Sequence, residues 1–404
     1  MAKGHIIIGL DVGTSRVKTI IAQKQSGEDL LEVLDAEIFP SFGLRKGVVI
    51  NIDDVSESII ESVNQAKKNS RQKIEAVYAS LGGSHIFSAP SHGVVAVSRA
   101  DQKISQEDID RVLQAAQAIS LPSNKQILHT LPIQFTIDSE GGIKNALGLS
   151  GVRLEVEALL LGGFSPYIKN LTQAILESDL EINDLVLSPL AAARACLTPR
   201  QKELGVALLD IGAETTSLAI FEEGDLIHLA IFPIGSAHIT NDIAIGLRCD
   251  IDIAERIKQE YGVASPQWIS KKDVIDISST LGSTLVFSRK RLAEIIEARF
   301  SDILDSVKKE FKKMTKEILL PAGIVLTGGG ANLPKIVDLV KKELRLPCHL
   351  GIPMGFQKSI EDPSLSVACG LVLWGLDLEE ESKNSPGDKK ISSKFKKMFK
   401  VFIP

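Results

Sequence analysis

Two short segments of the sequence carry residues suited to phosphate binding. Residues 5–22 read HIIIGLDVGTSRVKTIIA, and residues 205–220 read GVALLDIGAETTSLAI. Each is an apolar run, an Asp-x-Gly turn with hydroxyl residues and a second apolar run, which predicts a β-hairpin. Glycine lets backbone N–H groups approach a phosphate closely, and the hydroxyls add further donors. We therefore expect the two turns to hold a phosphate chain through Gly13, Thr14, Ser15, Gly212, Thr215 and Thr216.

Three charged residues belong to the same two hairpins. Asp11 and Asp210 each end the first apolar run, where a carboxylate would hold hydrated Mg²⁺ against the phosphates. Lys18, in the second run of the first hairpin, would reach the terminal phosphates as a point charge. A single Asp-x-Gly segment is usually no more than a β-turn. Two copies about half a chain apart instead indicate two related lobes that face each other.

Two further motifs suit the rest of a nucleotide. Residues 324–334 read IVLTGGGANLP, a buried strand and three glycines (Gly328, Gly329, Gly330) before an expected helix start at Asn332. Backbone that flanks an adenosine and its phosphates needs such a glycine run. Glu255 and Lys258 lie one turn apart on a predicted helix. Such a pair is usually a surface ion pair, and only the other motifs make it a candidate ribose contact.

The composition is that of a folded, multidomain chain with an unusual end. The 404 residues are 44% hydrophobic and 24% charged, which excludes wholesale disorder. The formal net charge of −5 argues against nucleic-acid binding. The last 16 residues hold six lysines and no acid, so the rest of the chain carries −11. Four scattered cysteines suggest reduced thiols in the cytosol.

Residues 389–404 predict an amphipathic helix, because their apolar side chains follow one helical stripe and lysines cover the rest. The helix is too short to span a ~30 Å hydrocarbon core but suits an anionic membrane surface. A helix packed on the body is the alternative, which the acidic segment 377–388, a predicted flexible linker, disfavours. The expected membrane-binding residues are Ile391, Lys394, Phe395, Lys397, Met398, Phe399 and Phe402.

The order of these motifs resembles the actin/Hsp70 nucleotide-binding superfamily and, within it, the FtsA family of bacterial cell division. Further matching segments are GVRLE at 151–155 and ITNDIA at 239–244. The resemblance implies an α/β, actin-like two-lobed fold of duplicated ribonuclease-H-like domains, with a small α/β subdomain inserted in the first lobe and a C-terminal amphipathic helix. The expected parts are 1–84 and 163–204 (lobe 1 core), 85–162 (inserted subdomain), 205–247 and 314–376 (lobe 2 core), 248–313 (smaller subdomain of lobe 2), 377–388 (linker) and 389–404 (membrane helix).

The resemblance also implies a function. ATP and Mg²⁺ would lie between the lobes, and the protein would polymerise, recruit later division proteins and bind the C-terminal peptide of FtsZ on residues 248–313. It would thereby tether FtsZ filaments to the cytoplasmic face of the cell membrane at the division septum, as a peripheral membrane protein with no nucleic-acid partner.

Four positions depart from the pattern that the resemblance implies, one of them Ser236, which stands where a glycine is expected after Gly235. Strong ATPases of the superfamily place Glu or Gln where this chain has Ser188, so we expect slow ATP hydrolysis at most. ATP would then act mainly as a conformational and polymerisation ligand. Ala213 and Glu214 stand where the second hairpin usually has glycines, and Glu214 would repel a phosphate unless it points away.

Two alternative functions stay open. An FtsA-like adaptor of pilus assembly would share the fold and the insertion, but would have no need of an amphipathic tail of its own. A small-molecule kinase of the same superfamily would need a carboxylate base over a substrate pocket, and the sequence offers no such constellation.

Overall fold

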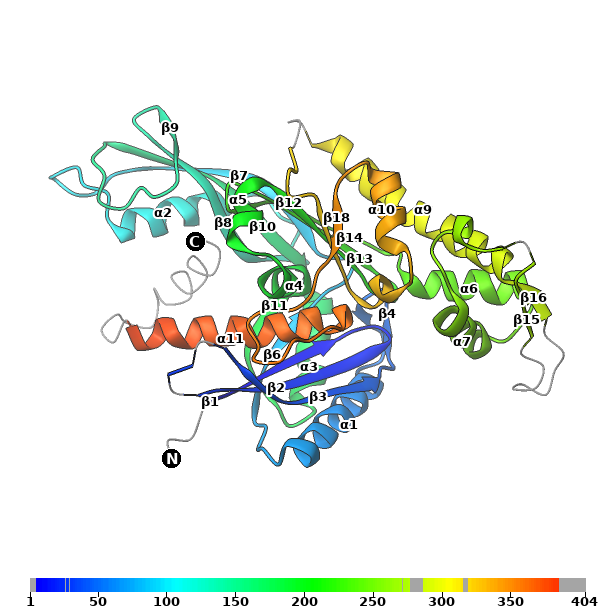
Figure 1. The fold of residues 1–404 in the computed structure, drawn as a ribbon. Helices are drawn as coiled ribbons and strands as arrows, with labels where there is room; N and C mark the ends of the chain where they lie inside the picture. Colours follow the sequence, from blue (N-terminus) through cyan, green and yellow to red (C-terminus); the bar gives the residue numbers. More distant parts are fainter. Residues whose placement is uncertain are drawn as a thin grey trace.

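Two five-stranded sheets of identical topology form the two lobes of the protein (Figure 1). The computed structural model describes residues 5–25, 27–28, 30–270, 272–276, 286–314 and 319–384. The first sheet has the order β11–β6–β1–β2–β3 and the second β14–β13–β12–β17–β18. In both, an antiparallel meander of three strands is followed by two parallel strands. The predicted duplication is therefore confirmed at the level of strand pairing.

The strand bounds show that both predicted hairpins form. The first sheet consists of β1 (His5–Val12), β2 (Arg16–Lys24), β3 (Glu32–Pro40), β6 (Ala76–Leu81) and β11 (Glu181–Leu187). The second consists of β12 (Val206–Ile211), β13 (Thr216–Glu222), β14 (Asp225–Phe232), β17 (Ile324–Thr327) and β18 (Cys348–Leu350). The Asp-x-Gly turns connect β1 to β2 and β12 to β13, so each turn lies at the end of an antiparallel pair.

A separate four-stranded sheet forms the inserted subdomain, which projects at the upper left of Figure 1. Its strands are β7 (Phe87–Ala96), β8 (Lys125–Ile137), β9 (Glu140–Ile143) and β10 (Arg153–Phe164), and helix α2 (Gln106–Gln117) packs on them. A capping box between Ser105 and Asp108 begins α2. The subdomain also touches lobe 2, because the Ser88 hydroxyl donates to the Leu229 carbonyl at 2.7 Å.

Helices α4 (Ser188–Cys196) and α11 (Ser366–Asn384) pack against each other. Helix α4 contacts strands of both sheets, whereas α11 packs on β1, β2 and β6 of the first. A side chain at Gly370 would place its Cβ 1.8 Å from the Ala191 carbonyl oxygen, so the close crossing of these helices requires glycine. The expected linker at 377–388 is wrong in its first part, because α11 continues to Asn384. Residues 385–388 and the predicted membrane helix at 389–404 lie outside the described residues.

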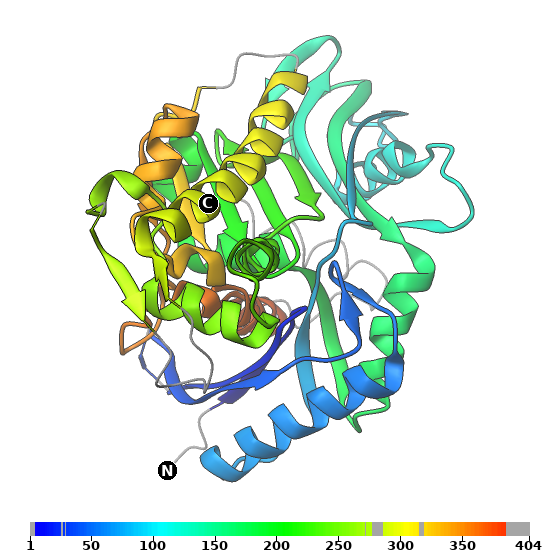
Figure 2. The same cartoon turned by 90° about the vertical axis from the view of Figure 1, so that its right-hand side faces the viewer.

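The remaining helices cover the outer faces of the sheets. Helices α1 (Ile52–Ser70) and α3 (Ser165–Leu176) pack on the first sheet, and Figure 2 shows α1 along its outer side. In the second lobe α6, α7 and α9 form a group in which α6 contacts both others, and α10 contacts α9 and β18. Their bounds are α6 (Ser236–Leu247), α7 (Ile251–Tyr261), α9 (Arg289–Lys313) and α10 (Ile336–Leu344).

Shorter elements complete the chain. They are β4 (Leu44–Arg45), β5 (Val48–Val49), α5 (Pro199–Leu204), η1 (Pro266–Trp268), β15 (Val274–Asp276), β16 (Val286–Ser288), η2 (Gly329–Asn332) and η3 (Pro363–Leu365). The helix expected to start at Asn332 instead starts at Ile336, because the glycine run forms the 3-10 turn η2 and residue 334 is a proline. Within the described ranges, no helix is both long and apolar enough to cross a bilayer.

Candidate functional site

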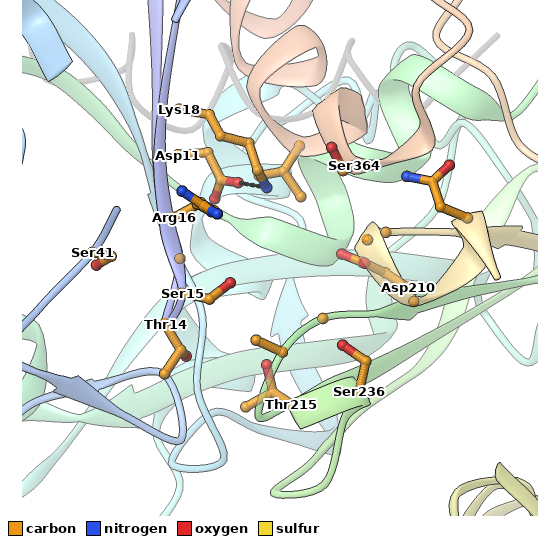
Figure 3. Close-up of a pocket in the computed structure, with 18 of the residues that line it drawn as sticks. Asp11, Thr14, Ser15, Arg16, Lys18, Ser41, Asp210, Thr215, Ser236 and Ser364 are labelled. Atoms are coloured by element: carbon orange, nitrogen blue, oxygen red, sulfur yellow. Dashed lines mark hydrogen bonds and ion pairs between the residues drawn. The ribbon is translucent and has the colours of Figure 1, made fainter. Parts of the chain in front are cut away.

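A cavity of about 790 Å³ lies between the two lobes (Figure 3). Both Asp-x-Gly turns, the glycine run after β17 and helix α7 contribute to its walls. All the predicted nucleotide-binding residues except Thr216 line it, namely Asp11, Gly13, Thr14, Ser15, Lys18, Asp210, Gly212, Thr215, Glu255, Lys258, Gly328, Gly329 and Gly330. A volume of this size suits a small organic ligand or cofactor. Residues from four distant parts of the sequence thus meet around a single cavity.

The placement of Thr216 differs from the prediction. Its side chain is fully buried, and its hydroxyl donates to the Ile234 carbonyl at 2.8 Å. Thr216 is the first residue of β13, where alternate side chains point to opposite faces of the sheet. Thr215 before it and Ser217 after it line the cavity instead. Thr216 therefore anchors the second hairpin to the connection between β14 and α6, and it does not line the cavity.

The charged pair of the first hairpin is held in register by the sheet. Asp11 and Lys18 are directly paired residues of β1 and β2, and Lys18 Nζ lies 3.0 Å from Asp11 Oδ2. The Ser80 hydroxyl donates to the other carboxylate oxygen of Asp11 at 2.8 Å. Burial opposes the charged form of Lys18, but the carboxylates of Asp11, Asp210 and Asp362 together outweigh this cost, so the pKa of Lys18 is raised above its ordinary value. The ammonium therefore stays charged at the cavity wall.

Asp210 is the equivalent aspartate of the second hairpin. Burial raises its pKa to about 6, and the Asp11 carboxylate adds to this rise while the attraction of Lys18 opposes it. In Figure 3 the Asp210 carboxylate points into the cavity from the wall opposite Asp11 and Lys18. A cation that binds near such a buried carboxylate stabilises its charged form.

The carboxylates that line the cavity are too few to hold Mg²⁺ alone, but they suit an Mg²⁺ ion that is also bound by the phosphates of a nucleotide. Within the described part of the chain, no group of three His, Cys, Asp or Glu side chains could hold a metal ion alone. Mg²⁺ in nucleotide sites is usually bound through one or two carboxylates, water and the phosphates of the ligand. Asp11 and Asp210, on opposite walls of the same cavity, supply that number of carboxylates.

The glycine run forms the wall beneath Asp210. Gly328 has a φ of 86°, and a Cβ there would lie 2.1 Å from Asp210 Oδ1. Glycine is therefore required at this position for steric and conformational reasons. Gly329, Asn332 and Ser364 continue the wall, and the Asn332 amide donates to Asp362 Oδ1 at 2.9 Å. The three glycines of this turn thus present backbone, rather than side chains, to the cavity.

Glu255 and Lys258 project from α7 toward α6 and form a polar cluster. Lys258 Nζ lies 2.7 Å from Glu255 Oε2 and 2.8 Å from Thr240 Oγ1, and it also donates to the Ser236 carbonyl at 3.3 Å. Thr240 donates to the same carboxylate oxygen of Glu255. The Lys258 ammonium lowers the pKa of Glu255 despite the opposing effect of burial. The cluster thus holds the Glu255 carboxylate in a fixed position as an acceptor for a ligand hydroxyl, while the three N–H groups of Lys258 are already bonded within the cluster.

Arg16 and Ser364 are among the polar cavity residues that were not predicted from the sequence. Arg16 lines the cavity from the start of β2, two residues before Lys18 and on the same face of that strand. The period of two along β2 was the signal that could have found it. Ser364 lines the cavity from the 3-10 turn η3, some 35 residues after the glycine run, and no local pattern marked it.

Ser188 and Glu214 show what the departures from the expected pattern do. Ser188 begins α4 and lines the cavity, so a hydroxyl stands there in place of a carboxylate or amide. The acidic residues of the described lining are Asp11, Asp210 and Glu255. Glu214 is absent from that lining, and its carboxylate accepts the Lys46 backbone N–H at 2.5 Å. The expected repulsion of a phosphate is thus avoided, because the side chain points toward lobe 1.

Comparisons with known proteins agree with this geometry. Residues 83–161 match the family model "SHS2 domain inserted in FTSA", and residues 207–370 match that of the cell division protein FtsA. The FtsA of Pseudomonas aeruginosa is 36% identical over 382 residues, which cover 94% of this chain and 91% of the relative. That of Borreliella burgdorferi is 35% identical, with 98% and 96% covered. The chain belongs to the FtsA family.

Solved structures place this FtsA-family chain among actin-like proteins. A chain of the PilM–PilN type IV pilus biogenesis complex has a TM-score of 0.66 at 19% identity, with 92% of this chain and 98% of that chain covered. MreB5 of Spiroplasma citri bound to AMPPNP has a TM-score of 0.57 at 15% identity, with 94% and 99% covered. The actin-like two-lobed α/β fold with an inserted subdomain is thereby confirmed.

Proposed function

We propose that this FtsA-family protein binds ATP with Mg²⁺ between its lobes and uses it as a conformational ligand for assembly. The observation that carries the proposal is the cavity between two hairpins of equal topology, lined by thirteen of the fourteen residues predicted from the motifs. The AMPPNP-bound MreB5 of similar fold supports it.

Each wall of the cavity has a part in binding. The backbone of the two turns, with Thr14 and Thr215, would donate to the phosphates, and Lys18 would neutralise their charge. Mg²⁺ would supply further neutralisation, with Asp11 and Asp210 orienting its bound water. Glu255 and Lys258 would hold the ribose hydroxyls, and the glycine run would lie against the rest of the nucleoside.

Hydrolysis would be slow in such a site. Ser188 begins α4 at the cavity wall, where a carboxylate or amide would be needed to orient the attacking water. A serine hydroxyl is a weak base, so the ligand would stay intact for long periods.

We further propose that the protein forms filaments and connects FtsZ to the membrane. Residues 389–404 would lie at an anionic lipid surface, and residues 248–313 would bind the C-terminal peptide of FtsZ. Each lysine near such a surface contributes about 1 kcal/mol at most, so one tail would bind reversibly. Several tails on one filament would bind far more tightly through avidity.

Electron microscopy on lipid monolayers tests the proposal. The full chain with ATP and Mg²⁺ should form filaments on an anionic monolayer, and should form none there with EDTA and no nucleotide. The matched controls are a chain without residues 389–404 and a monolayer of neutral lipid. Isolated monomers under all these conditions would contradict the proposed assembly.

A further inference from the structure

One hydrogen bond joins the two lobes beside the cavity, between residues whose neighbours Gly47, Ala213 and Thr215 line it. Glu214 lies in the turn between β12 and β13 of lobe 2, and its Oε2 accepts the backbone N–H of Lys46 at 2.5 Å. Lys46 lies in the turn between β4 and β5 of lobe 1, 168 residues away. The bond therefore depends on how far the two lobes are apart.

The turn that carries Lys46 is a rigid part of lobe 1. Lys46 and Gly47 have φ values of 52° and 73°, the positive pair typical of a two-residue type I′ hairpin turn. A Cβ at Gly47 would lie 2.6 Å from Gly83 Cα, so the turn rests directly on the backbone after β6. Its base is closed by the N–H groups of Ile50 and Asn51, which both donate to the Gly43 carbonyl. We call residues 43–50 the strap.

The strap contacts both phosphate hairpins through neighbouring donors. The Gly47 N–H donates to Thr14 Oγ1 at 3.2 Å, while the Lys46 N–H donates to Glu214. Thr14 and Gly47 both line the cavity, as do Gly82 and Gly83 beneath the strap. One turn thus spans the gap between the first hairpin and the second.

From these contacts we infer that Glu214 is a positioning residue that ties the second phosphate hairpin to the strap and slows nucleotide release. This inference rests on the proposed nucleotide binding. The tie holds the two hairpins at one separation, so that their donors converge on the same phosphate chain. Separation of the second hairpin from the strap then requires that the Glu214 contact breaks.

The carboxylate suits this position for two reasons. Its length lets it cross from lobe 2 to the strap, and a charged acceptor binds an N–H more strongly than a neutral one. The contact also turns the negative charge away from the cavity, whose lining includes Gly212, Ala213 and Thr215 but not Glu214. The backbone of the hairpin therefore remains free to donate to a phosphate.

Release kinetics of a fluorescent ATP analogue test the role of Glu214. The full-length chain is loaded with mant-ATP and Mg²⁺, and release is followed by stopped flow after an excess of ATP is added. Glu214→Ala should release the analogue about three- to tenfold faster, the effect of losing one hydrogen bond of ordinary strength at an exposed position. Glu214→Gln keeps an oxygen acceptor and should lie between Glu214→Ala and the wild type. Glu61→Ala, at an exposed position on α1, is the matched control.

Hydrogen exchange of the strap gives a readout that needs no nucleotide. In Glu214→Ala, one additional amide of the segment 43–50 should exchange rapidly. Glu61→Ala should keep the wild-type pattern, and Glu214→Gln should exchange that amide at an intermediate rate. Unchanged exchange and release in Glu214→Ala would overturn the inference. If both Glu214→Ala and Glu214→Gln released the analogue more slowly than the wild type and by the same factor, the inference would also be overturned. The main effect of Glu214 would then be repulsion between its carboxylate and the phosphates. Failure of the wild type to bind mant-ATP would contradict the proposed function instead, and exchange would still test the tie.

Discussion

Asp11 and Asp210 occupy equivalent positions in the two sheets and face one cavity, but the residues paired with them differ. The hairpin register places Lys18 opposite Asp11 and Ser217 opposite Asp210. Asp11 therefore has a cation 3.0 Å away, while burial raises the pKa of Asp210 to about 6. The duplication has thus produced one aspartate that is neutralised within its own hairpin and one that is poised for an added cation.

Asp210→Asn should stabilise the protein without nucleotide at neutral pH. The unfolded carboxyl titrates near 3.8 and the folded one at about 6, so the folded protein binds the proton more tightly. The free energy of unfolding of the wild type therefore falls as pH rises from about 4 to about 6. At pH 7.5 the asparagine variant should be more stable by roughly 2–3 kcal/mol. Thermal denaturation of both proteins from pH 4 to 8 measures this difference in stability. A difference that stays the same at low pH would contradict the prediction.

Asp11→Asn should have the opposite effect on stability. It leaves the buried Lys18 ammonium without its carboxylate, and breaking a buried ion pair costs about 3 kcal/mol or more. Urea denaturation at pH 7.5 measures the loss. The double variant Asp11→Asn/Lys18→Met removes both charges and should recover part of it. Equal stability of Asp11→Asn and the wild type would show that water, not Asp11, neutralises Lys18.

Local patterns in the sequence were enough to predict much of the fold and the site. The repeated Asp-x-Gly turn between apolar runs predicted both hairpins, since turn residues and strand alternation are set within a few residues. The face of each strand was harder to predict. Thr216 points away from the cavity, and its hydroxyl donates to the carbonyl of Ile234, which lies between β14 and α6. Arg16 was missed although it shares a face with Lys18.

Long-range contacts account for the remaining differences. The acidic segment after Leu376 resembled a linker by composition, yet it is helical to Asn384. Lobe 1 supplies the opposite charges: Arg194 binds Asp377 through two hydrogen bonds of 2.6 and 2.9 Å, and Lys24 lies 3.6 Å from Glu380. Glu214 meets Lys46 across 168 residues, so no local pattern could have shown where it points.

Replacement of Ser188 tests why turnover should be slow. Ser188→Glu adds a carboxylate at the first residue of α4, where a negative charge is also tolerated by the helix dipole. We expect steady-state phosphate release with Mg²⁺ to rise about tenfold, a modest share of what a well-placed base contributes. Ser188→Ala is the control and should match the wild type. Rapid phosphate release by the wild type itself would contradict the expectation of slow hydrolysis.

Glu255 should determine the preference for a ribose over a deoxyribose. Its carboxylate is fixed by Lys258 and Thr240, so it can accept a hydrogen bond from a ligand hydroxyl without reordering. Competition of ATP and dATP for the mant-ATP site should show weaker binding of dATP by about three- to tenfold. Glu255→Gln should reduce that ratio, while Glu260→Gln, on the same helix, should preserve it. If the ratio of dATP to ATP binding were the same in both variants, Glu255 would not contact the ribose.

Removal of residues 389–404 should abolish membrane binding and leave nucleotide binding intact. Six lysines and an apolar stripe are lost together, and the remaining chain carries −11, which anionic lipid repels. Sedimentation with vesicles of anionic lipid measures binding at low and high salt. Phe395→Ala/Phe399→Ala keeps every lysine and should still lose most of the pelleting, because charge alone binds weakly and is screened by salt. Unchanged pelleting of the truncated chain would place the membrane contact on the lobes.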